Sequence, residues 1–218
     1  LAQYKEYTKP VPGDITLHGP FMDMVSGSPD PRIAAVCVQR YSSTIHIASE
    51  LGAKRIVLHA NFIGSLQNRP YREGWHKRSV EFWRPIAEHA AENGVELAIE
   101  NMWEFDPSII ADLLAEVNHP NLKACIDVGH AHLFGSKRYS FAQWLATLQP
   151  WLAEFHMNNN NGAVDEHHGF DWPEGVLDYH ALLPKIREVA PETDIVLEMD
   201  SVQDMRDSLR YFSINELA

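Results

Sequence analysis

Residues 122–130 read LKACIDVGH, an apolar run that ends in Asp127 and is followed three residues later by His130. An unpaired carboxylate is costly to bury, so a short buried strand that ends in Asp predicts a metal ion or a substrate at that end. An Asp that caps a following helix produces the same pattern. This junction alone therefore leaves both interpretations open, and the rest of the chain has to decide between them.

Five other segments have the same pattern of a short apolar, partly β-branched run that ends in His or Glu. They are ITLH (15–18), RIVLH (55–59), VELAIE (95–100), LAEFH (152–156) and DIVLE (194–198). Such runs are typical of strands that are buried on both faces of a parallel sheet. Chance would scatter His and Glu along the strands, so six similar ends predict one shared site.

Helical patterns separate these strands. They cover about 32–51, 73–93, 107–117, 140–149, 178–189 and 202–213, and the first presents Val36, Tyr41, Ile45 and Ala48 at helical spacing. Alternating strands and helices predict a parallel sheet, whose ligands bind at the carboxyl ends of the strands. We expect one α/β domain over residues 1–218, of the (β/α)8 TIM-barrel type, that shows six βα units and lacks the first two. Open sheet edges would favour a homo-oligomer or further upstream sequence.

Composition narrows the partners and the location. The formal net charge of −12 argues against nucleic acid, whose backbone normally meets a basic surface. No signal peptide and no apolar run long enough to span a membrane is found, which favours a cytoplasmic protein without a membrane partner. Cys37 and Cys125 lie in apolar runs and are predicted to be buried thiols.

The predicted site is rich in groups that bind divalent cations. The strand ends supply His18, His59, Glu100, Asp127, His130, His156 and Glu198, and the loop after His156 adds Asp165 and His167 as an Asp-x-His pair. Imidazole and carboxylate ligands without thiolate favour Mn²⁺, Zn²⁺ or Co²⁺, and Mg²⁺ when few histidines bind. The sequence therefore predicts a divalent-metal cofactor.

Six motifs together resemble the xylose-isomerase-like TIM barrels, over about residues 14–213. They are LHGPF (17–21), IVLHANF (56–62), AIENM (98–102), CIDVGHAHLFG (125–135), FHMNNNNGAVDEHHG (155–169) and IVLEMDS (195–201). This superfamily includes the D-tagatose 3-epimerase group and endonuclease IV, the latter in AP endonuclease family 2. The set is specific for the superfamily and does not by itself select a member.

The epimerase resemblance implies a sugar or sugar-phosphate isomerase or epimerase. One divalent ion would be held by Glu100, Asp127, His156 and Glu198. The catalytic residues Glu100 and Glu198 would exchange a proton at carbon through a metal-stabilised enediolate. The substrate would be a small sugar-like molecule, contacted by His18, His59, His130 and Trp103.

The endonuclease IV resemblance implies a trinuclear-zinc phosphodiesterase that uses all nine positions, with His18, His59, His130, Asp165 and His167 as the further metal ligands. Two departures from the endonuclease IV motifs, together with the charge balance, favour the sugar enzyme. Gly129 stands where that enzyme would have Cys, residues 162–164 are Gly-Ala-Val in place of Ser-Arg-Val, and 18 Lys and Arg face 30 Asp and Glu. A non-catalytic metal- or sugar-binding barrel is the third reading.

Overall fold

The fold is an alternation of strands and helices. The computed structural model describes residues 1–9 and 12–212. Its elements are α1 (Ala2–Thr8), β1 (Thr16–His18), α2 (Pro31–Leu51), β2 (Arg55–His59), α3 (Arg69–Glu92), β3 (Glu96–Glu100), α4 (Ser108–Val117), β4 (Leu122–Asp127), α5 (Val128–His130), η1 (Ala131–Gly135), α6 (Phe141–Leu148), η2 (Gln149–Trp151), β5 (Leu152–Met157), α7 (Tyr179–Val189), β6 (Asp194–Leu197), α8 (Val202–Leu209) and η3 (Arg210–Phe212). The six strands are hydrogen-bonded in sequence order, from β1 to β6. The predicted α/β class is confirmed, and residue 213, the predicted end of the last helix, lies outside the described residues.

The chain divides into two compact units. Residues 1–100 and 109–124 form the first unit, and residues 101–108 with the chain from Cys125 onward form the second. The expectation of a single domain over residues 1–218 stays a prediction.

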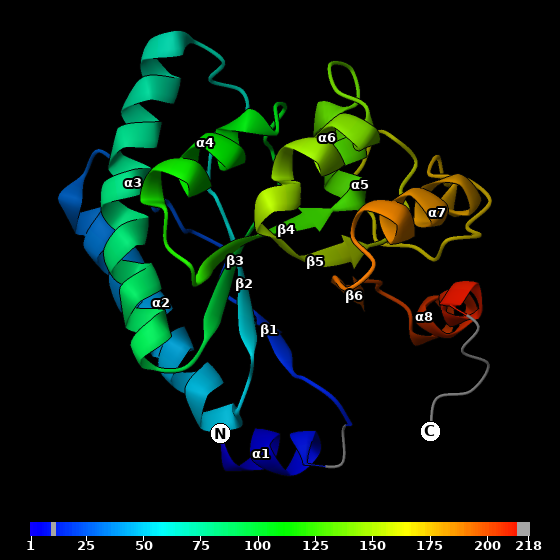
Figure 1. Ribbon diagram of the computed structural model, residues 1–218, viewed down its shortest axis with the longest axis horizontal. Coiled ribbons are helices and arrows are strands. Elements are labelled where there is room, and N and C mark those ends of the chain that lie inside the picture. Colours follow the sequence, from blue (N-terminus) through cyan, green and yellow to red (C-terminus); the bar gives the residue numbers. More distant parts are fainter. Residues whose placement is uncertain (10–11, 213–218) are drawn as a thin grey trace. The chain divides into compact units, whose positions relative to one another are not determined.

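In the first unit, β1, β2 and β3 are parallel, and α2 and α3 lie side by side (Figure 1). Helix α2 begins where the Asp30 side chain accepts a hydrogen bond from the backbone N–H of Arg32, and it ends at Gly52 with φ 70°. Its buried residues are Cys37, Tyr41, Ile45 and Ala48. Val36, which the sequence analysis grouped with three of these residues at helical spacing, does not share their buried face. Val36 is 46% exposed, because the buried stripe follows the 3.6-residue period from Cys37.

In the second unit, β5 and β6 are parallel, and α6 contacts both η1 and α7 (Figure 1). Ser140 and Gln143 form a reciprocal capping box at the start of α6. The chain from Ala131 to Gly135 is π-helical. A π-helical turn is rare and often occurs beside a functional site, and this one directly follows His130.

Burial differs between the inner and the outer strands of the order. All five residues of β2 are buried, whereas β6 is only half-buried and His18 of β1 is exposed. The expectation that every strand is buried on both faces was therefore wrong for β1 and β6. Among the described residues these two strands end the hydrogen-bonded order, so each is paired with one neighbouring strand. Among the described residues, no helix is long and apolar enough to cross a membrane.

Candidate metal centre

The first unit gathers His18, His59 and Glu100 at the ends of its three strands. His59 and Glu100 are Cα partners in the parallel register of β2 and β3. The Nε2 atoms of His18 and His59 lie 3.2 Å and 3.3 Å from Oε2 of the fully buried Glu100. His18 Nδ1 donates to the carbonyl of Gly19 at 2.8 Å, so its Nε2 either donates a second ring hydrogen to the Glu100 carboxylate or shares a cation with it. This arrangement fits a metal ligand set.

Asp127 ends β4 and is oriented by three neighbours. Its Oδ1 accepts a hydrogen bond from the backbone N–H of His130 at 2.6 Å, so it does cap α5. Its Oδ2 accepts from Asn158 Nδ2 at 2.8 Å. The Asn101 amide pairs with the backbone N–H and C=O of Asp127, each at 3.0 Å. The cap and the candidate ligand are thus the same residue, and the two interpretations of the junction do not compete.

His156 faces two carboxylates. Its Nε2 lies 3.1 Å from Glu154 Oε1, and its Nδ1 lies 2.9 Å from Glu198 Oε2. The ligand atoms of Asp127, His156 and Glu198 all lie within 4.8 Å of one another. Two carboxylates and one imidazole within that range match the donor set of a divalent-cation site.

A third group consists of His130, Asp165 and His167. The two imidazole Nε2 atoms lie 3.2 Å and 3.5 Å from the same oxygen, Asp165 Oδ1. His130 Nδ1 is 2.9 Å from the carbonyl of Asn101, and His167 Nδ1 is 3.0 Å from the carbonyl of Glu198. Because a carbonyl can only accept, Nδ1 of each ring carries the hydrogen and Nε2 is aimed at Asp165.

Charge coupling in this third group is strong. Hydrogen bonds from His130 and His167 hold the pKa of Asp165 well below its ordinary value. The hydrogen bond to Asp165, aided by the charges of Asp127 and Glu198, raises the pKa of His167 to about 9 against the opposing effect of burial. The proton on His167 balances negative charge at a place where a cation would do the same.

The predicted residues therefore fall into three groups. His18, His59 and Glu100 meet in the first unit; Asp127, His156 and Glu198 meet in the second, as do His130, Asp165 and His167. Trp103 belongs to none of these groups and lies in the loop after β3, 48% exposed.

Sequence reasoning missed three polar residues that contact these groups. Glu154, Asn158 and Asn101 are all fully buried. The strand period of two contains a signal for the first, since Glu154 and His156 must share one face of β5. Asn158 begins a run of four asparagines that reads as a polar loop, and nothing in the sequence marks Asn101 as a partner of Asp127.

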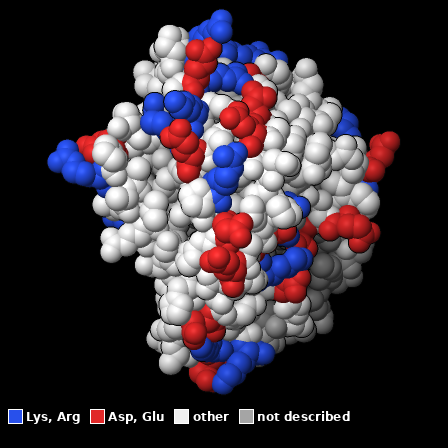
Figure 2. Space-filling view, turned by 60° about the vertical axis from the view of Figure 1, so that its left-hand side comes forward, with Lys and Arg blue, Asp and Glu red and all other residues white. Residues whose placement is uncertain are grey.

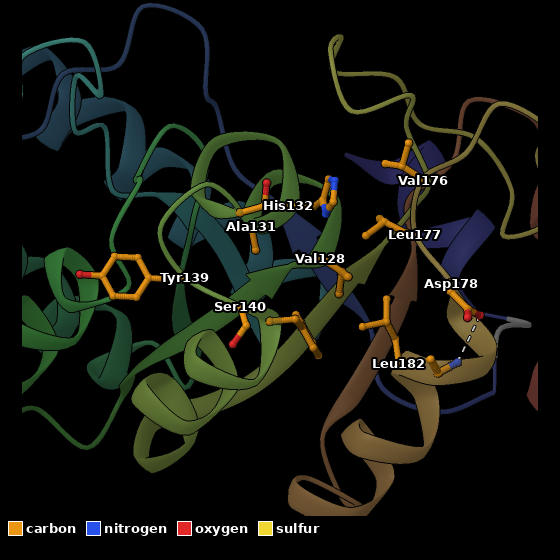
Figure 3. Close-up of a pocket in the computed structure, with 12 residues that line it drawn as sticks. Val128, Ala131, His132, Tyr139, Ser140, Val176, Leu177, Asp178 and Leu182 are labelled. Atoms are coloured by element: carbon orange, nitrogen blue, oxygen red, sulfur yellow. Dashed lines mark hydrogen bonds between the residues drawn. The ribbon is translucent and has the colours of Figure 1, made fainter.

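A separate groove lies beside α5 in the second unit (Figure 3). It has a volume of about 250 Å³ and contains none of the nine candidate ligands. Val128, Ala131 and His132 form one wall, and residues 176–178 with Leu182 form the opposite one. Burial lowers the pKa of His132. Half of the residues that line the groove are aliphatic, and most of the others are polar.

Charge is finely mixed on the surface that carries α2 and α3 (Figure 2). Acidic and basic side chains alternate there in small groups. On α3, Arg69 and Glu73 form an ion pair at 2.6 Å, and Arg72 pairs with Asp112 of α4 at 3.2 Å. No continuous basic stripe of the kind that follows a nucleic-acid backbone runs over the face shown.

Comparison with known proteins identifies a family and a relative that match most of the chain. Residues 2–214 match the family described as xylose isomerase-like TIM barrel. An uncharacterised protein of Methanocaldococcus jannaschii, MJ1614, is 26% identical over 194 residues, which are 87% of this chain and 72% of that protein.

Two solved structures share the fold over nearly the whole chain. A D-tagatose 3-epimerase-like protein matches with a TM-score of 0.83 and 24% identity, over 98% of this chain and 82% of its own. The protein TTHB071 from Thermus thermophilus, in a structure soaked with ZnCl₂, matches with a TM-score of 0.81 and 25% identity, over 97% and 81%. These matches confirm the TIM-barrel type.

Proposed function

The chain belongs to the xylose isomerase-like TIM barrel family, and from this premise we propose that it is a divalent-metal-dependent isomerase or epimerase of a sugar or sugar phosphate. The observation that carries the proposal is the grouping of Asp127, His156 and Glu198, whose ligand atoms lie within 4.8 Å of one another. The likeness to a D-tagatose 3-epimerase-like protein supports sugar chemistry.

We propose that these three residues hold one ion, with Glu100 at the end of β3 as the fourth ligand. Mn²⁺, Co²⁺, Zn²⁺ and Mg²⁺ all suit a set of three carboxylates and one imidazole. A bound ion of this kind supplies polarisation of a neighbouring C=O and C–OH pair, which makes the adjacent C–H more acidic.

The protein's own groups carry out the proton transfer in this proposal. Glu198 or Glu100 removes a proton from the substrate carbon, and the other carboxylate returns one, so that the sugar is isomerised or epimerised. Burial of Glu100 excludes water that would otherwise compete for that proton. His18, His59, His130 and the half-exposed Trp103 are proposed to bind the hydroxyl groups and the apolar face of the sugar.

A second candidate is the trinuclear-zinc phosphodiesterase of the endonuclease IV type. The specific observation in its favour is the arrangement of His130 and His167, whose Nε2 atoms converge on one oxygen of Asp165. That arrangement is suited to a further metal ion.

Elemental mass spectrometry of protein purified without chelator separates these candidates. About one Mn, Co, Mg or Zn per chain supports the isomerase, and two or three zinc ions per chain support the phosphodiesterase. The functional test incubates ketoses with the metal-loaded protein in D₂O and follows deuterium at the reacting carbon by NMR. Deuterium uptake that is lost in Glu198→Gln supports the proposal. Ketose turnover that survives this substitution contradicts it, and metal binding without turnover leaves the non-catalytic barrel.

A further inference from the structure

We infer that Glu154 and Asn158, which stand on either side of His156, are positioning residues that orient two ligands of the proposed metal site. The inference rests on the proposed function, because it assumes that His156 and Asp127 bind a cation. It adds two side chains that do not themselves contact the ion but determine which atom of each ligand faces it.

The period of the strand places these side chains together. Residues 154, 156 and 158 alternate along β5 and its end, so their side chains leave the same face of the strand. Glu154 and Asn158 are fully buried, and His156 is 3% exposed. The strand and its end thus present the proposed ligand His156 with one polar side chain two residues before it and another two residues after it.

Glu154 selects the donor atom of His156. Three other imidazoles of the candidate groups, those of His18, His130 and His167, donate Nδ1–H to a carbonyl and aim Nε2 at a carboxylate. His156 is reversed, because its Nε2 faces Glu154 Oε1 at 3.1 Å while its Nδ1 faces Glu198 at 2.9 Å. The contact of Nε2 with Glu154 has the geometry of a hydrogen bond, and a carboxylate only accepts. We therefore assign the hydrogen to Nε2, which leaves the Nδ1 lone pair for a cation held between His156 and Glu198.

Asn158 orients the carboxylate of Asp127. Its Nδ2 donates to Asp127 Oδ2 at 2.8 Å, and the reversed amide would instead oppose two acceptor oxygens. The backbone N–H of His130 is bound to the other oxygen, Oδ1, at 2.6 Å, so both oxygens of Asp127 are held by a donor. The carboxylate therefore cannot rotate without breaking both contacts.

The structure also tolerates an unfavourable contact to keep this amide in place. Asn158 Oδ1 is buried without a hydrogen-bond donor among the described residues. It lies 2.1 Å from the point where residue 129 would carry a Cβ, so only glycine at that position leaves room for it. A buried acceptor that gains nothing for stability indicates that the N–H at the other end of the amide is needed for function.

Isothermal titration of the chelator-treated full chain with Mn²⁺ and Co²⁺ tests the inference. Glu154→Gln and Asn158→Leu are each expected to weaken binding by about 10- to 100-fold and to shift the visible spectrum of bound Co²⁺. The matched controls Glu174→Gln and Asn161→Ala alter exposed or partly exposed residues of the same types and should bind as the wild type does. Unfolding of the metal-free variants by urea shows whether a loss of binding is only a loss of folding.

The possible outcomes separate the positioning role from the proposed function. Variants that bind Mn²⁺ as tightly as the wild type overturn the positioning role and leave the proposed function intact. A wild type that binds neither metal overturns the metal-dependent function, and the positioning role with it. If Glu154→Gln does not fold, the ¹⁵N NMR shifts of the His156 ring in the wild type test the role of Glu154 in its place. These shifts report which ring nitrogen carries the hydrogen, and a hydrogen on Nδ1 in place of Nε2 overturns that role.

Discussion

His59 and Glu100 are Cα partners on adjacent parallel strands, and His59 Nε2 lies 3.3 Å from Glu100 Oε2. The contact follows from the register, because two strands that end at the same level bring their last side chains together. Glu100 is fully buried at that point, and both histidines of the group approach the same oxygen. The group therefore depends on the backbone ladder rather than on a loop.

Glu100→Gln should remove a negative charge that the proposed chemistry needs both for metal binding and for proton transfer. We expect kcat for ketose isomerisation to fall by about 10²- to 10⁴-fold, with weaker Mn²⁺ binding. Glu116→Gln is the control, since Glu116 is an exposed residue that pairs with His76 on α3. Steady-state kinetics and titration calorimetry measure the two effects, and an unchanged kcat would exclude a role for Glu100 as acid or base.

His167 should titrate far above the usual range of histidine in the metal-free protein. Its pKa is raised to about 9, chiefly by the hydrogen bond to Asp165, and the NMR shift of its ring proton should follow this titration. If zinc is added and the group of His130, Asp165 and His167 binds it, the titration disappears. If only the group around His156 binds metal, His167 continues to titrate, and the phosphodiesterase reading loses its support.

The pKa shifts of His167 and Asp165 predict how the stability of the metal-free protein depends on pH. The pKa of His167 is higher in the folded state, so its contribution is fully present below about pH 6.5 and is lost as the pH rises toward 9. The pKa of Asp165 is lower in the folded state, so its contribution is present above its ordinary value near 3.8 and is lost as the pH falls. Urea unfolding at pH 6 and pH 9 should show a loss at pH 9 that is absent in His167→Gln.

Gly129→Ala should weaken metal binding without touching a ligand. A Cβ at this position would lie 2.1 Å from Asn158 Oδ1, so the amide that orients Asp127 has to move. Gly94→Ala is the control, because Gly94 has φ 71° but open space around a Cβ, and it should lower stability by about 1 kcal/mol while Mn²⁺ binding stays unchanged. Equal Mn²⁺ affinity for Gly129→Ala and the wild type would show that the amide has room to adjust.

Asn159→Ala should mainly affect folding stability. The Asn159 amide donates to the carbonyls of Phe170 and Leu177 at 3.1 Å and accepts from the N–H groups of Asn160 and Leu177 at 3.0 Å. Loss of these buried hydrogen bonds should lower the free energy of unfolding by about 2 to 4 kcal/mol. Asn161→Ala, which removes a local turn contact, should cost less than about 1 kcal/mol. Urea titration compares the two, and similar losses would contradict this ranking.

The sequence predicted those residues of the candidate site whose positions follow from the ends of parallel strands. A run such as RIVLH reveals both the strand and the residue at its end, and the end residues of neighbouring strands must meet. The burial of β6 was predicted incorrectly, because the pattern of Ile195, Val196 and Leu197 is the same whether a strand has one neighbour or two. Asn158 was missed for a different reason, since its role depends on Asp127, a residue distant in sequence.

The position of the candidate ligands has an evolutionary consequence. Most of them stand on strands or shortly after them, whereas Asp165 and His167 belong to the polar loop that follows β5. Insertions and substitutions in the polar segments 60–68 and 170–177, which hold no candidate ligand, should alter the walls around the proposed substrate while the strand register keeps the ligands on the strands in place. Related barrels can in this way differ in their substrates while they keep the same metal ligands.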